Sequence, residues 1–233
     1  EQLRAELREY SGGLRGHVRV FANTTAVTDF LPDILPTYLA AHPKINIDLQ
    51  EKPNGEIARG VRESRADIGI VAGQVDTTGL TATHFNTDRL VLVVPRGHAL
   101  ARRKAVAFAE TLDEDHVGMH ASSTLHAYLT DIAQRLDRPL KLRIQLANFD
   151  ALCRMVGAGV GVGVVPETTA RRNLAAMAIR QVELTDAWRW RERFVLVREG
   201  EAQPEYARAL IDVVCAHYDT KSNELDTSHA RRA

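Results

Sequence analysis

The stretch that decides the fold is "HVGMHASST" (residues 116–124), because it repeats an arrangement found earlier in "HVRVFANTT" (residues 17–25). In both, a short run of mainly apolar residues predicts a strand, and the small polar residues after it predict a turn at a helix N-terminus. The two stretches begin about 100 residues apart, a spacing that leaves room for several elements in each unit. The chain therefore contains an internal repeat.

Each unit continues in the same order from its polar turn. Helical spacing of apolar residues alternates with short β-rich runs, so each unit reads βαβαβ with short connections. This order predicts a parallel sheet flanked by helices. Pro32 and Pro36 predict a kink or a restart in the first helix, since each lacks an amide donor. The expected elements after the turns are, in the first unit, a helix at 26–41, a strand at 44–50, a helix at 55–64 and a strand at 66–73, and in the second unit a helix at 125–136, a strand at 140–148, a helix at 149–159 and a strand at 160–167.

The glycine-rich run "CRMVGAGVGVGVVPE" (residues 153–167) invites comparison with a phosphate-binding loop. No register of its four glycines gives G-x-G-x-x-G, and no Gly-Lys-Ser/Thr follows. The preceding residues have helical spacing, and the following ones form a β-rich run that ends at Pro166. We expect the glycines to end a helix at positive φ and then to enter a buried, closely packed strand.

Two further β-rich segments, Arg89–Leu100 and Glu192–Gly200, lie outside the repeat. Both are long and apolar enough to pass from one unit's sheet to the other's, and the closing helix at 204–218 should then lie on the first unit. The predicted fold class is α/β, with two Rossmann-like βαβαβ subdomains joined by two crossover strands and a cleft between them. The predicted divisions are the end of an amphipathic helix at 1–15, subdomain I at 16–94 plus 197–219, subdomain II at 95–196 and a disordered tail at 220–233.

The composition limits the kind of function. Lys plus Arg and Asp plus Glu each total 30 in 233 residues, so the formal net charge is zero, which argues against nucleic-acid binding by this chain alone. No apolar run is long enough to span a bilayer, and no signal-peptide pattern opens the chain at Glu1. We therefore expect a cytoplasmic protein that makes no membrane contact.

Catalytic and metal-binding motifs do not occur. The sequence has no G-x-S-x-G, H-E-x-x-H or C-x-x-C, so we predict no enzyme activity, no metal and no cofactor. Cys153 and Cys215 lie in apolar helical stretches and are expected to pack as small hydrophobes, with redox sensing as the alternative. The basic run at 101–104 is interpreted as a solvated turn.

The carboxyl ends of the predicted strands are the expected binding site, because α/β units bind ligands there. Asn23, Thr24 and Thr25 occupy this place in the first unit, and Ser122, Ser123 and Thr124 occupy it in the second. Amides at helix N-termini favour an anion, although such residues are also common simply as helix caps. The candidate ligand-binding residues are Thr24, Thr25, Ala72, Gly73, His120, Ser122, Ser123, Thr124, Asn148, Phe149, Val165 and Pro166.

Taken in order, several segments resemble the effector-binding domain of LysR-type transcriptional regulators. They are "LRGHVRVFANTT", "FLPDILPTYLAAHPKINIDLQE", "ADIGIVAG", "RLVLVVPRGHAL" and "MVGAGVGVGVVPE", and the resemblance extends from about Leu14 to Tyr218.

The resemblance implies a periplasmic-binding-protein type 2-like fold with a small-molecule effector between the subdomains. It also implies a homodimer, tetrameric in the full-length protein, whose DNA binding resides in an N-terminal winged helix-turn-helix. Residues 1–15 would be the end of the linker helix to that domain. By position, the family's pocket falls on Thr24, Thr25, Ser122–Thr124, Asn148 and Phe149.

We therefore predict a regulatory domain that binds a small, anionic effector and relays the change to a DNA-binding domain. A solute-binding protein of a transport system has the same architecture and remains the main alternative. An enzyme built on two such subdomains is the third possibility.

Overall fold

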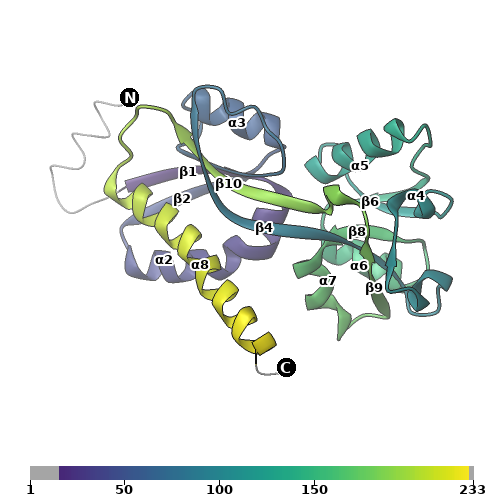
Figure 1. The fold of residues 1–233 in the computed structure, drawn as a ribbon. Coiled ribbons are helices and arrows are strands. Elements are labelled where there is room, and N and C mark those ends of the chain that lie inside the picture. Colours follow the sequence, from purple (N-terminus) through teal and green to yellow (C-terminus); the bar gives the residue numbers. More distant parts are fainter. Residues whose placement is uncertain (1–15, 231–233) are drawn as a thin grey trace. The chain divides into compact units, whose positions relative to one another are not determined.

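A computed structural model describes residues 16–230 of the chain, and side chains from residue 16 to residue 217 (Figure 1). These residues separate into two compact units. Unit 1 combines the residues up to Asn86 with those from Glu192 onward, and unit 2 spans Thr87–Arg191. The predicted end of a linker helix at residues 1–15 lies outside the described residues.

Unit 1 begins with the predicted βαβαβ order. Its central strand β1 pairs in parallel with β2 on one side and with β3 on the other. The elements are β1 (Gly16–Ala22), η1 (Ala26–Phe30), α2 (Leu31–Ala41), β2 (Ile45–Glu51), α3 (Asn54–Arg62) and β3 (Ile68–Ala72).

The predicted interruption of the first helix is confirmed near Pro32. A single π-helical turn, η1, ends at Phe30, and α2 restarts at Leu31 with Pro32 in its first turn. A proline is tolerated there because the first amides of a helix have no intrahelical acceptor. Pro36 lies inside α2 and does not end it.

Unit 2 repeats this order. Strand β6 pairs in parallel with β7, and the residue before β8 lies beside β6: Val117 N donates to Val162 O at 2.8 Å, and Val162 N donates to Asp115 O at 2.9 Å. The order β7–β6–β8 thus corresponds to β2–β1–β3, so the internal repeat is confirmed. The elements are β6 (His116–Met119), α5 (Thr124–Arg135), β7 (Leu142–Leu146), α6 (Phe149–Gly157) and β8 (Gly163–Pro166).

Two long strands, β4 (Leu80–Pro95) and β10 (Trp190–Arg198), run from one unit into the other and are neighbours in the sheet (Figure 1). β10 comes from unit 2 and pairs antiparallel with β3, while β4 comes from unit 1 and pairs antiparallel with β8. The prediction of two crossover strands is confirmed. β4 begins earlier than the predicted Arg89, because its first half is mostly exposed and polar and carries little apolar signal.

Several shorter elements enlarge unit 2 and were not predicted. β9 pairs antiparallel with β4 and parallel with β5, so it extends the unit 2 sheet beyond the repeat. These elements are η2 (Ala99–Arg102), β5 (Ala105–Val106), α4 (Phe108–Thr111), α7 (Glu167–Leu174), β9 (Ile179–Leu184) and η3 (Ala187–Arg189).

The closing helix α8 (Glu205–Ala230) packs on unit 1 as predicted, through Ala207, Leu210 and Val214. It continues to Ala230, whereas the sequence predicts disorder from residue 220. No glycine or proline interrupts residues 205–230, so few apolar groups there do not prevent helix formation.

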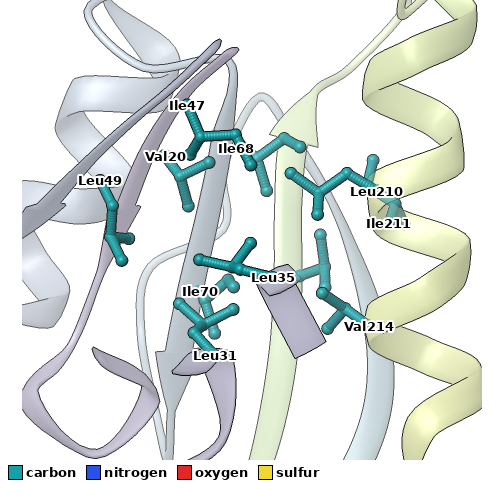
Figure 2. A pocket seen from close by; sticks show the side chains of 11 residues that line it. Val20, Leu31, Leu35, Ile47, Leu49, Ile68, Ile70, Leu210, Ile211 and Val214 are labelled. Carbon is teal, nitrogen blue, oxygen red and sulfur yellow. The ribbon is translucent and has the colours of Figure 1, made fainter. Parts of the chain in front are cut away.

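Each unit has its own apolar core. Helices α2 and α8 cover one face of the unit 1 sheet, and Figure 2 shows their side chains meeting those of β1, β2 and β3. The remaining space among these aliphatic side chains is ≈ 10 Å³, about that of one water molecule. This apolar crevice is therefore packing space and too small for an effector.

The glycine-rich run behaves as predicted. α6 ends at Gly157, Gly159 has a φ of 81°, and the following residues enter buried β8. The equivalent position of the first unit is Ser64, whose φ is 60°. These glycines therefore connect a helix to a strand and form no phosphate loop.

Candidate functional site

The turn after β1 joins three strand ends of unit 1. Asn23 Oδ1 accepts a hydrogen bond from Ala26 N at 3.0 Å, and Asn23 Nδ2 donates to Asn54 Oδ1 at 3.4 Å. Asn54 Nδ2 in turn donates to the carbonyl of Ala72 at 2.7 Å. Asn23 thus acts as a helix cap and also links the predicted site residue Ala72 to its own turn.

The threonines of this turn differ from each other. Thr24 Oγ1 donates to Glu51 Oε1 at 2.6 Å, at the last residue of β2. Thr25 stands at the N-cap of η1, is 4% exposed and makes no side-chain capping bond. The Thr25 hydroxyl therefore does not act as a cap, and Glu51 places a carboxylate beside Thr24.

Gly73 closes the same end of the sheet. Its φ is 78°, a conformation that favours glycine, and its amide donates to the carbonyl of Glu192 at 2.7 Å. In β10, Arg193 lies opposite Ala72 in register and is 2% exposed. Its guanidinium lies 5.0 Å from the centroid of the Phe30 ring. A buried cation therefore stands beside the carboxyl end of β3.

The turn after β6 contains Ser123, a buried residue at the start of α5. Ser123 is the N-cap residue of α5 and is 2% exposed, yet its side chain makes no capping bond. Its Oγ has no hydrogen-bond partner among the described residues. A buried hydroxyl left in this state costs about 1–3 kcal/mol. The position therefore favours an additional polar group at Ser123.

The neighbours of Ser123 add donors. The first helical bond of α5 runs from Ala127 N to Ser123 O, so the amides of residues 124–126 precede it and have no acceptor within the helix. Ser122 Oγ lies 2.8 Å from His120 Nδ1. Burial and, second, the charge of His120 lower the pKa of His126, which is therefore neutral at pH 7. This end of α5 offers amides, hydroxyls and one imidazole to an anion.

The other candidates in unit 2 have structural roles. Asn148 Oδ1 caps α6 by accepting from Ala151 N at 2.8 Å. Phe149 and Val165 are 1% and 0% exposed in the unit 2 core, and Pro166 is buried in β8. A ligand would meet Phe149, Val165 or Pro166 mainly through backbone atoms.

Glu51, Asn54 and Arg193 are site neighbours that the sequence analysis missed. Glu51 ends β2 and Asn54 follows it, so the expectation that ligands bind at the carboxyl ends of strands would have found both if it had been applied to β2. Arg193 was hidden inside an apolar strand, although strict alternation along β10 puts Arg191, Arg193 and Val195 on one buried face. The alternation of side chains between the two faces of a strand was therefore the signal that could have placed Arg193 on the buried face.

Other classes of site receive no support from the side chains. No group of three or more His, Cys, Asp or Glu residues within 16–217 could hold a metal ion. The Cys153 side chain is 0% exposed, so its thiol is shielded from oxidants. In the part of the chain that the structure describes, none of the helices combines the length and hydropathy of a membrane span.

Comparisons with known proteins identify relatives of this chain. The HTH-type transcriptional regulator CysL of Bacillus subtilis (strain 168) is 24% identical over 174 residues, which cover 75% of this chain and 58% of CysL. The chain spans about three fifths of the length of the curated relatives it matches.

Two solved structures share the fold. The CcmR regulatory domain of Synechocystis PCC6803 in complex with 2-PG has a TM-score of 0.75 and 20% identity, over 86% of this chain and 96% of that one. The BenM effector-binding domain with its effector benzoate has a TM-score of 0.73 and 19% identity, over 90% and 95% of the two chains.

The family model of the LysR substrate binding domain matches residues 11–219. The chain therefore belongs to the LysR substrate-binding domain family, the ligand-binding part of LysR-type transcriptional regulators.

Proposed function

We propose that this domain senses a small anionic effector through the polar turns after β1 and β6, and that the full-length regulator uses this signal to control transcription. The observation that carries the proposal is the partnerless Oγ of Ser123, buried at the N-terminus of α5. Asn23 and Asn148 each accept a capping bond from a helix amide, which the Ser123 side chain does not. A bound acceptor or donor would satisfy the buried hydroxyl of Ser123.

The charge of the effector follows from the groups around each turn. In unit 2, helix amides, hydroxyls and His120 favour a carboxylate or phosphate. In unit 1, Glu51 disfavours an anion beside Thr24, while Arg193 favours one beside Ala72. Benzoate, the effector of the related BenM domain, is itself a carboxylate. The anionic group of the effector is accordingly assigned to Ser123.

The wider assignments follow the family. Relatives named as transcriptional regulators support a regulator and lend nothing to the transport alternative. The proposal includes a protein without enzyme activity, acting in the cytoplasm, where its DNA lies. It also includes a homodimer that becomes a tetramer at full length, with DNA contacted by an N-terminal domain. Binding can shift such an assembly only if the effector prefers one of its arrangements.

Thermal and urea unfolding with a panel of small carboxylates and phosphorylated acids tests the proposal. A ligand at 100 times its dissociation constant should raise the unfolding free energy by about 2.7 kcal/mol. Ser123→Ala should reduce this gain, and should leave the ligand-free protein as stable or more stable, because it removes an unsatisfied buried hydroxyl. Thr24→Val tests the turn after β1 in the same way.

Thr130→Val is the matched control for Ser123→Ala. Thr130 also lies on α5, and its Oγ1 is likewise buried without a partner, but it stands away from the helix N-terminus. Its loss should leave the ligand-induced gain unchanged. An equal gain in wild type and Ser123→Ala would refute the assignment of Ser123. That one ligand contacts both turns stays a prediction, which the Thr24→Val, Ser123→Ala double variant tests.

A further inference from the structure

Unit 2 contains a concave surface that none of the candidate effector residues lines. This basic hollow, of ≈ 510 Å³, is formed by the segment between β4 and β5 together with β9. The two segments come together because β9 pairs with both β4 and β5. The charged or ionisable side chains of the basic hollow are those of Arg96, His98, Arg102, Arg103, Lys104 and Arg180.

Half of these groups have evident structural partners. His98 pairs with Glu114 at 3.4 Å, and Arg103 pairs with Glu110 at 2.5 Å. Arg96 Nη2 donates to the carbonyls of Leu174 and Met177, both at 3.4 Å. These three groups are explained by the packing of unit 2.

The other three cations lack such an explanation. Arg102, Lys104 and Arg180 are exposed, and among the described residues their side chains have no ion pair and no hydrogen bond. They come from separate places, since Arg102 ends η2, Lys104 precedes β5 and Arg180 lies in β9 opposite Val94. The sequence from 89 to 109 contains no acidic residue, and the nearby carboxylate of Glu183 pairs with Arg89 at 3.3 Å.

This convergence of like charges matters in a chain of zero net charge. Cations gathered in one concavity repel one another and create a local positive potential, which a multivalent anion would relieve. A solvated turn, as predicted for residues 101–104, explains Arg102 and Lys104 but does not explain why Arg180 joins them from another strand. The tertiary structure therefore changes the interpretation of this basic run.

The shape of the basic hollow restricts the anion. A nucleic-acid backbone needs an extended basic stripe, whereas here carboxylates of Glu110 and Glu114 pair with hollow residues, and Glu183 lines the adjoining depression with Lys104 and Arg180. Such a setting suits a compact ligand with concentrated charge. Guanidinium groups and an ammonium group are the usual protein partners of phosphate oxygens.

We infer that the basic hollow of Arg102, Lys104 and Arg180 binds a compact oligophosphate, such as a di- or triphosphate group, as a second ligand site of the domain. This site is separate from the turn at Ser123. Through the basic hollow, the domain would respond to phosphorylated metabolites in addition to its effector.

Titration calorimetry of the chain with inorganic triphosphate, diphosphate and orthophosphate, at one fixed ionic strength, tests the inference. Affinity should rise with the number of phosphate groups. The triple variant Arg102→Gln, Lys104→Gln, Arg180→Gln should bind triphosphate at least about tenfold more weakly, and since all three side chains are exposed, it should remain folded.

A variant with the same change of charge provides the control. Arg59→Gln, Lys44→Gln, Arg208→Gln removes two arginines and one lysine from exposed positions of unit 1. It should bind triphosphate like the wild type. If both triple variants lose the same affinity for triphosphate, the loss reflects only the overall charge of the protein, and the inference is overturned.

Two further outcomes would also overturn it. If citrate binds as tightly as triphosphate, the site accepts polycarboxylates as well. If a random DNA duplex binds more tightly than triphosphate, and the triple variant of the basic hollow loses this DNA binding, the surface is a nucleic-acid surface. Ser123→Ala should leave triphosphate binding unchanged, so failure here is distinguishable from failure of the proposed effector site.

Discussion

Gly161 lies against the backbone of the neighbouring strand in unit 2. A Cβ added at residue 161 would come within 2.2 Å of the carbonyl oxygen of Asp115, a contact that neither partner can avoid by rotating a side chain. A Cβ added at the next glycine, Gly163, would come within 2.7 Å of Leu152 Cδ2 and 3.1 Å of Val117 O. Close approach of β6 and the segment leading into β8 therefore depends on residues without side chains.

Gly161→Ala is expected to destabilise the protein by about 1–3 kcal/mol or more, because the added methyl forces the backbone apart. Urea unfolding of the variant measures the loss. Gly55→Ala is the control: Gly55 lies in α3, an added methyl group would meet no atom within 4 Å, and the change should be neutral or stabilising by up to about 1 kcal/mol. Equal effects of the two changes would contradict the proposed close approach.

Residues of one type also differ according to place. Asn23 and Asn148 satisfy the amides of the helices they precede, whereas Ser123 in an equivalent sequence position does not. Residue identity predicts a cap in all three cases. The geometry separates the two structural caps from Ser123, whose hydroxyl makes no capping bond.

At the scale of elements, an ionic network ties β4, α7 and β9 together. Glu167 accepts bonds from Arg89 Nε at 2.8 Å and Nη2 at 2.5 Å, and from Gln181 Nε2 at 3.1 Å. Burial alone would raise the pKa of Glu167, but the bonds from Arg89 and Gln181 and the charges of Arg89 and Arg171 hold it below its ordinary value. The first residue of α7 is thereby fixed to the crossing strand.

This network predicts a specific dependence of stability on pH. A carboxyl group with a depressed pKa in the folded state stabilises fully above the unfolded value, about 4.3, and loses this contribution as pH falls through the folded value. Glu167→Gln should therefore cost about 1–3 kcal/mol at pH 7, and the gap to wild type should narrow below about pH 4.

Urea unfolding of both proteins at several pH values measures this gap. Glu56→Gln, which alters an exposed carboxylate in the first turn of α3, serves as the control and should stay within about 0.5 kcal/mol of wild type throughout. A gap for Glu167→Gln that is constant from pH 7 to pH 3 would exclude ionisation as its cause.

At the scale of the whole molecule, the two cores differ in how the chain builds them. The large core of unit 2 consists entirely of residues between Leu90 and Leu184. The core of unit 1 needs Val195 of β10 and Ala207, Leu210 and Val214 of α8, more than 100 residues after β3. Unit 2 is contiguous in sequence, and unit 1 is completed only by the end of the chain.

A fragment of residues 87–191 should therefore unfold cooperatively by itself, whereas a fragment of residues 16–86 should not. The fragment 87–191 contains all the buried residues of its apolar core. The fragment 16–86 lacks the core residues that β10 and α8 contribute. Circular dichroism during urea titration distinguishes the two. A cooperative transition in 16–86 would show that α8 and β10 are dispensable for unit 1.

Much of this fold could be predicted from the sequence. Apolar periodicity is a local property of the chain, so it gave the two βαβαβ units and the helix-to-strand role of the glycine run. The missing amide donor of proline gave the restart near Pro32. The small polar residues themselves gave the turns after β1 and β6. Apolar periodicity had limits. It missed β9 and α7, and it placed the start of β4 too late, because short or polar edge segments carry a weak apolar signal.

The sequence by itself determined the order of elements within the two repeated units, the repeat and the family, because each depends on neighbouring residues or on their fixed order. Only the tertiary structure decided that the Ser123 hydroxyl is buried without a partner, that Arg193 lies buried beside Ala72, and that Arg180 joins Arg102 and Lys104. These three findings depend on contacts between segments that are far apart in the chain. Such contacts decide which side chains are buried and which charges lie together, and local sequence patterns do not reveal them.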